Sequence, residues 1–203
     1  MSDANTNSAA AVPRDQRLAA WIQRLQEATA SLSRAVERDA IEREIARSAA
    51  RIVDAHGAVV VRRGGDDGAV DLAVHWEGGG IALGPVPADV MTALADVVRS
   101  GRPSRTVMDD RAVIAAPIRT GHRAGGAVAV YGVCGEASGD ISDVLATLAA
   151  TGAASLETAT VVAESLRDRR QSEALADLAH ALGSSQRLGE VLHLGLRHSS
   201  AIL

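Results

Sequence analysis

Side chains that could carry out chemistry are few in this sequence. Cys134 is the single cysteine among 203 residues, so neither an internal disulfide nor a cysteine-ligated zinc site can form. The acidic pairs Asp66-Asp67 and Asp109-Asp110 lie in a predicted turn and a predicted loop, where solvated turn residues account for them. The sequence has no nucleophile–base pair, no glycine-rich phosphate loop and no paired carboxylates at a useful spacing. It therefore predicts a protein that is not an enzyme.

One histidine has a position that a phosphoryl-accepting residue could occupy. His180 lies in LADLAHALGSSQ (175–186), on a predicted helix that follows a long helical linker. Helices of that kind usually place an acidic residue directly after the histidine, to orient and activate the ring. Ala181 stands there instead. The sensor portion of a histidine kinase is kept as an alternative function.

The charge of the chain argues against nucleic acid as a partner. The formal net charge is −4, and all 21 basic residues are arginine. General affinity for nucleic acid depends on clustered positive charge that neutralises phosphates. The densest basic segments, Arg62-Arg63 and Arg167–Arg170, both adjoin acidic residues and are interpreted as solvated faces.

Composition also bears on location. Residues 1–16 (MSDANTNSAAAVPRDQ) have no charged segment followed by an apolar one, so they are predicted to be a disordered tail and not a signal peptide. No uncharged apolar run long enough to span a bilayer occurs. We therefore expect a soluble, cytoplasmic protein that does not use a membrane as a partner. Trp21, Trp76 and Tyr131 are the only aromatic residues, too few for a site built on stacked bases.

Two helices are predicted before the first strand. Apolar residues recur at helical spacing over 17–37, namely Leu18, Trp21, Ile22, Leu25, Ala28, Leu32 and Val36. A second helix, Ile41–Ala55, is predicted with Asp39 as its N-cap. Gly57 is expected to end it as a left-handed residue.

The remainder alternates between strand and helix patterns. Strands are predicted over 58–61 and 69–76, joined into a hairpin by the turn GGDDG, and over 104–108, 113–119 and 126–133. Helices are predicted over 86–100 and 141–170. Because the strands follow one another through turns while helices gather at the ends, the fold class is α+β with an antiparallel sheet.

The last predicted helix carries an apolar seam. Small or apolar residues recur at 141, 145, 148, 152, 159, 162 and 166, which is consistent with pairing in a coiled coil. A shift of the chain by 150 residues also superimposes the N-terminal helices on the C-terminal segment. In that alignment the two segments have their apolar residues at matching positions, through a first helix, a break and a second helix.

These elements together resemble the GAF domain, a small-molecule-binding fold related to PAS domains. The matching segments are DAHGAVVVRR (54–63), VRSGRPSRTVMDD (98–110), RAVIAAPIRTGHRAGGAVAVYG (111–132) and ISDVLATLAATGAASLE (141–157). The resemblance implies a GAF domain over 38–160, with a GAF/PAS-like sheet flanked by an N-terminal signalling helix (17–37) and a long C-terminal helix. The repeat then makes 161–186 a linker helix and 187–203 the leader helix of a truncated second GAF unit.

The ligand-binding signatures known in this family can be compared with the residues of this chain. The Asn-Lys-Phe-Asp-Glu signature of cyclic-nucleotide binders is absent, because the chain has neither lysine nor phenylalanine. Cys134 lacks the neighbouring histidine typical of bilin attachment, and one cysteine cannot support the thiol exchange of free methionine sulfoxide reductases. A haem or redox sensor with a histidine ligand is kept as an alternative. Of its candidates, His56 is expected at a helix end, His122 at a turn tip and His75 facing outward, so no cofactor is predicted.

The resemblance also places a ligand pocket between the sheet and the central helix. Its candidate residues are Trp76, Met91, Leu94, Arg111 and Arg119, with the arginines available to hold an anion. The function implied is a sensory or regulatory input module that relays a small-molecule or conformational signal to a downstream effector. We expect it to form a homodimer through its terminal helices, because their apolar residues exceed what one small sheet can cover.

Overall fold

The computed structural model describes residues 13–64, 69–108, 111–134 and 138–199. The elements in chain order are α1 (Arg14–Leu32), α2 (Arg38–Ile52), β1 (Gly57–Arg63), β2 (Val70–Glu77), β3 (Gly80–Ile81), α3 (Ala88–Ser100), β4 (Ser104–Met108), β5 (Arg111–Thr120), β6 (Arg123–Cys134) and α4 (Ser138–Ser199). The chain divides into two units, one ending at Ala159 and the other beginning at Thr160. The predicted tail over 1–16 lies largely outside the described residues, but α1 already begins at Arg14.

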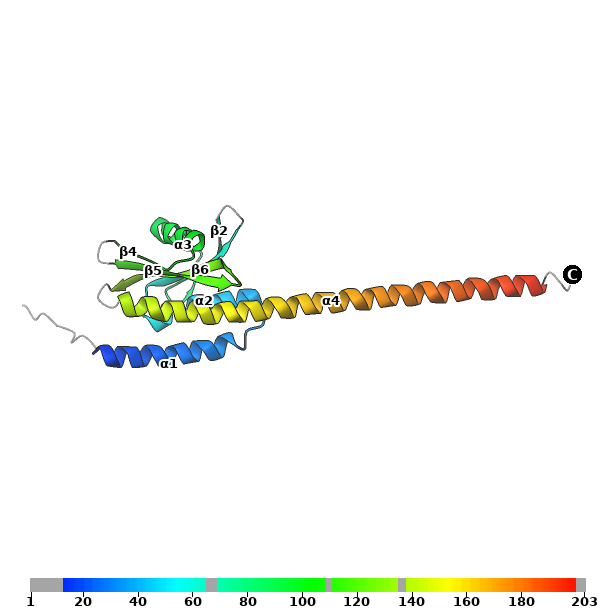
Figure 1. Cartoon of the computed structure of the whole chain (residues 1–203), viewed down its shortest axis with the longest axis horizontal. Coiled ribbons are helices and arrows are strands. Elements are labelled where there is room, and N and C mark those ends of the chain that lie inside the picture. The colour runs from blue at the N-terminus through cyan, green and yellow to red at the C-terminus, as the bar shows by residue number, and fades with distance from the viewer. Residues whose placement is uncertain (1–12, 65–68, 109–110, 135–137, 200–203) are drawn as a thin grey trace, which may run out of the picture. The chain divides into compact units, whose positions relative to one another are not determined.

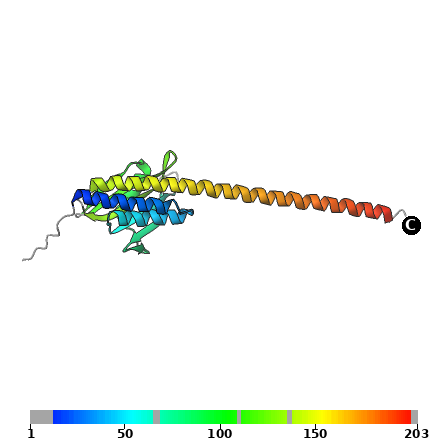
Figure 2. The same cartoon turned by 90° about the horizontal axis from the view of Figure 1, so that it is seen from below.

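The first unit is built on a six-stranded antiparallel sheet with the strand order β3-β2-β1-β6-β5-β4. Figure 1 shows α3 over one face of this sheet, and α2 with the first part of α4 over the other. In Figure 2, which views the molecule from below, α1 lies alongside α2 and α4. This confirms the predicted α+β class with an antiparallel sheet.

Apolar spacing explains why α2 packs where it does. Ile41, Ile45, Ala49 and Ile52 recur every three or four residues, and all four are buried. Gly152 of α4 permits a close approach, because a Cβ at that position would overlap the side chain of Ile45. The two helices therefore share one core with the sheet.

One irregularity in β2 affects the whole edge of the sheet. Val60 of β1 pairs with Val74, while the next residue, Val61, pairs with Leu72. Ala73 is thus an extra residue on β2, which forms a β-bulge. The bulge breaks the regular alternation of side chains along this strand.

The ends of α2 differ from the prediction. Asp39 lies within the first turn, and Glu37 is the N-cap residue. The helix ends at Ile52, and the left-handed residue after it is Asp54, with φ 50°. Gly57 instead begins β1. The short strand β3 has no counterpart in the prediction.

The long helix α4 differs more. It continues as one helix to Ser199, through the boundary between the predicted linker helix (161–186) and the predicted leader helix (187–203). The seam is also mostly internal: Ile141, Leu145 and Leu148 are fully buried in the core of the first unit. By length and composition, Gly139–Asp177 could cross a membrane. Its apolar residues up to Ala159 lie in that core, whereas Val161, Val162, Leu166 and Leu175 are exposed.

Candidate functional site

A cluster of polar side chains lies on the α3 face of the sheet. His75 and Glu77 come from β2, Tyr131 from β6, and His56 from the turn before β1. Gly57 makes the cluster possible, because any Cβ at that position would overlap the phenol ring of Tyr131. With no side chain at Gly57, Tyr131 reaches across β1 to β2.

The cluster is joined by short contacts. His75 Nε2 lies 2.8 Å from Tyr131 Oη, and His56 Nε2 lies 2.7 Å from Glu77 Oε1. His75 Nδ1 is 3.3 Å from the carbonyl oxygen of Gly84. A carbonyl can only accept, so a neutral His75 carries its proton on Nδ1 and accepts a hydrogen bond from Tyr131.

Burial governs the chemistry of Tyr131. Burial of the phenol, followed by the nearby charge of Glu77, raises the pKa of Tyr131 to about 12 from 10.0. At neutral pH the side chain is therefore a hydrogen-bond donor and not a phenolate nucleophile. The cluster fixes the positions of strands β1, β2 and β6 relative to one another.

The expectation for His75 was wrong. The side chain is 3% exposed and lies on the α3 face, opposite Val74. The prediction from strand alternation assumed that one face of β2 is exposed, whereas helices cover both faces of the sheet. Within the described residues both ring nitrogens of His75 already have partners, so ligation of haem iron would require it to give up one of them. His56 follows α2 and His122 lies exposed in the β5–β6 turn, both as expected.

The predicted pocket residues with described side chains lie on both faces of the sheet. Trp76 packs against the core on the α2 face, whereas Leu94 is fully buried in the core on the α3 face, with Met91 packed beside it. Arg119 donates a hydrogen bond of 2.6 Å to the carbonyl oxygen of Gly101, at the end of α3. The side chain of Arg111 lies outside the described residues, although its backbone begins β5. Among the described side chains, Trp76 therefore lies on the other face of the sheet from Met91 and Leu94.

The other functional candidates from the sequence have separate positions. Cys134 ends β6, and its side chain lies outside the described part of the chain. His180 is exposed on α4. The side chain of Ala181, which stands where a histidine kinase usually has an acidic residue, lies outside the described residues.

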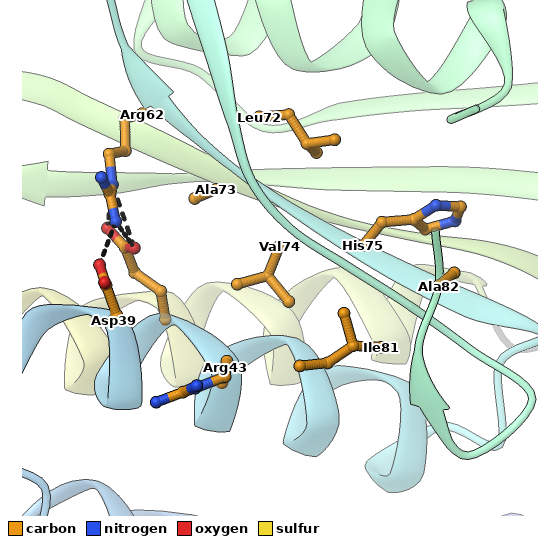
Figure 3. A pocket seen from close by; sticks show the side chains of 10 residues that line it. Asp39, Arg43, Arg62, Leu72, Ala73, Val74, His75, Ile81 and Ala82 are labelled. Carbon is orange, nitrogen blue, oxygen red and sulfur yellow. Dashed lines mark hydrogen bonds and ion pairs between the residues drawn. The ribbon is translucent and has the colours of Figure 1, made fainter. Parts of the chain in front are cut away.

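A cavity of about 480 Å³ lies on the opposite face, between α2 and the β2–β3 hairpin (Figure 3). It is lined by Asp39, Glu42, Arg43, Arg62, Leu72, Ala73, Val74, His75, Ile81 and Ala82. Its volume falls within the range of small-molecule sites.

An ion-pair network forms one side of this cavity. Arg62 Nη2 donates to both Asp39, at 2.6 Å, and Glu42. The Glu42 side chain is 2% exposed, and Arg38 Nε also donates to it at 3.2 Å. The hydrogen bond to Glu42 raises the pKa of Arg62, so its charge is permanent. The guanidinium of Arg43 has no ion pair or hydrogen bond among the described residues, and it is exposed.

This network was not predicted from the sequence. Arg62 was interpreted as part of a solvated basic segment, although its side chain lies on the same face of β1 as Ala58 and Val60. Strand alternation from those buried residues places Arg62 toward α2. That alternation, combined with the acidic residues at the start of the helix, could have revealed the pairing.

Comparison with known proteins reveals similarity in fold. No protein-family model matches the sequence, and no curated protein matches it. Solved structures do match. The GAF domain of nlh2 from A. aeolicus in an inactive state is 12% identical (70% of this chain, 98% of that one, TM-score 0.55). The native GAF domain of the potassium sensor histidine kinase KdpD from Escherichia coli is 20% identical (71% and 99%, TM-score 0.52).

An enzyme has the same fold. The free methionine-R-sulfoxide reductase from Neisseria meningitidis, in complex with its substrate, is 14% identical (74% of this chain, 96% of that one, TM-score 0.57). At these identities the matches show similarity of fold alone. This chain therefore has the fold of a GAF domain.

Proposed function

We propose that this chain is a sensory or regulatory input module that dimerises through its terminal helices and relays a signal to a downstream effector. The fold is one that a sensor histidine kinase also uses. Only a single cysteine is available for thiol chemistry, so we propose a binding and signalling role rather than a reductase activity. A cytoplasmic location, without nucleic acid or membrane as a partner, is part of the same proposal.

The observation that carries the proposal is the change in α4 at about residue 160. Up to Ala159 its apolar side chains are buried in the core of the first unit. Beyond that residue Val161, Val162, Leu166 and Leu175 are exposed. Exposed apolar residues on a single helix are the usual means by which two helices pair. Ile22 on α1 and Val36, which lies between α1 and α2, are also exposed.

The pairing seam is short. Ala159, Val162 and Leu166 follow the spacing of a coiled-coil seam, and the next seam positions are Arg169 and Glu173. Within one helix these two side chains pair with each other, Arg169 Nε donating to Glu173 Oε1 at 2.8 Å. Because this pair partly neutralises the charges at the seam, two helices can still approach there, but without close apolar packing. A loosely packed segment of this kind suits transmission of a shift in helix register.

Light scattering at tens of micromolar protein tests dimerisation. We expect a dimer for the native chain, and a monomer for both Val162→Asp and Leu166→Asp, because a carboxylate in an apolar helix pair is costly to bury. Leu83→Asp is the control, since Leu83 is also an exposed apolar residue but lies far along the chain, before α3. Leu156→Asp is unsuitable, because Leu156 is buried in the core.

A native chain that is monomeric, or two aspartate variants that leave the mass of a dimer unchanged, would overturn dimerisation through α4. The relay is tested separately. In a protein that joins this chain to its effector, Arg169→Leu with Arg170→Leu should extend the seam and fix the output in one state. An output unchanged despite a more stable dimer would contradict the relay.

A further inference from the structure

We infer that the cavity between α2 and the β2–β3 hairpin binds a small organic monocarboxylate with an apolar body, and that Arg43 holds its carboxylate. The site lies on the α2 side of the sheet, whereas Tyr131 of the polar cluster and the predicted pocket residues Met91 and Leu94 belong to the α3 side. It goes beyond the proposed function, since binding there requires neither dimerisation nor an effector.

The walls of the cavity fit an apolar body. In Figure 3, Val74 and Ile81 border the same space as Arg43. Ala73 and Ala82 also line it, and their small side chains leave the volume open. Ile81 is 54% exposed although it lies against a cavity, so a ligand that covers it removes apolar surface from water.

The charges select the other end of the ligand. Asp39 and Glu42 are already engaged by Arg62, and Glu42 also by Arg38. The guanidinium groups of Arg38, Arg43 and Arg62 outnumber these two carboxylates by one positive charge. Of the three arginines, Arg43 is the one without a partner among the described residues. A planar guanidinium matches a carboxylate through two parallel hydrogen bonds.

The same charges argue against a more highly charged ligand. The carboxylate of Asp39 is 74% exposed beside the cavity, and it would repel a second negative charge. One free guanidinium can neutralise one anion. A monocarboxylate therefore fits better than a dicarboxylate or a phosphate ester.

An NMR titration of the full chain with 4-methylpentanoate tests the inference. We expect saturable amide shifts at millimolar concentration, confined to residues 38–43, 72–76 and 81–82. The uncharged isostere 4-methylpentanamide should bind about tenfold more weakly, because it cannot form the charge-assisted pair. Arg43→Gln should weaken binding of the acid by a similar factor and leave binding of the amide unchanged.

Two further variants complete the test. Ile81→Asp places a carboxylate on the apolar wall at an exposed position, so the protein should fold and lose binding of the acid. Arg99→Gln is the control, since Arg99 is an exposed, ion-paired arginine on α3, and it should bind as the native chain does. Equal binding of acid and amide, unchanged binding by Arg43→Gln, shifts that map to the α3 face, or no saturable shift would each overturn the inference.

Discussion

The face of the sheet under α3 and the face under α2 and α4 bury different kinds of side chain. Under α3 the core is mostly valine and alanine with Leu94, and it ends in the polar cluster around His75 and Tyr131. Under α2 and α4 it contains larger aliphatic residues, including Ile45 and Leu148, and it extends to α1. The first face is therefore fixed by uncharged hydrogen bonds as well as packing, whereas the second combines apolar packing in several layers with the ion pairs of Glu42.

The largest effect should come from cavities in the two cores. Leu148→Ala should lower the free energy of unfolding by about 4 kcal/mol, and Leu94→Ala by about 3 kcal/mol. Both side chains are fully buried, but Leu148 is held between helices and sheet, whereas a single helix above Leu94 can settle into the space. Urea unfolding of the two variants measures the difference. A greater loss at Leu94 would show that the α3 face is the more rigid of the two.

A smaller effect should follow from filling the space at Gly57. Gly57→Ala should cost about 2 kcal/mol, because the new methyl group displaces the ring of Tyr131. In a Tyr131→Ala background the same change should cost much less, since the ring is gone. Gly80→Ala is the control, because a Cβ there meets open space. Equal costs of Gly57→Ala in both backgrounds would show that the ring and the glycine are not coupled.

The smallest effect is a fall in the free energy of unfolding at alkaline pH, which comes from Tyr131 on the α3 face. The folded pKa of Tyr131 is raised to about 12 from 10.0, so the unfolded chain releases this proton at a lower pH than the folded chain does. The free energy of unfolding should then fall by about 1 to 2 kcal/mol as the pH rises from 10 to 12, with no contribution below that range. Tyr131→Phe should be less stable at neutral pH, because it leaves His75 Nε2 without its donor, and should lose this slope. A slope that persists in the variant would assign it to other groups.

Much of the fold could be predicted from local pattern. The first hairpin, the central helix and the three later strands are where their periodicity and turn residues indicate, because each signal is local. The polar cluster could not be predicted this way, since Tyr131 and His75 meet only through the pairing of β6, β1 and β2. Trp76, which the family resemblance placed in a pocket beside the central helix, packs instead against the core on the α2 face. The apolar seam of α4 gave no sign of which residues its own domain would bury.

The β-bulge at Ala73 has a consequence for solubility. β3 pairs with only Trp76 and Glu77, so among the described residues the outer edge of β2 from Val70 to Val74 has no neighbouring strand. An open edge of that length, with Leu72 exposed, is a template on which another chain could add a strand and begin aggregation. The extra residue disrupts the repeat of backbone donors and acceptors that such an addition needs, and Asp71 places a charge on the same edge. Deletion of Ala73 would restore a regular edge, and the protein should then aggregate when it is concentrated.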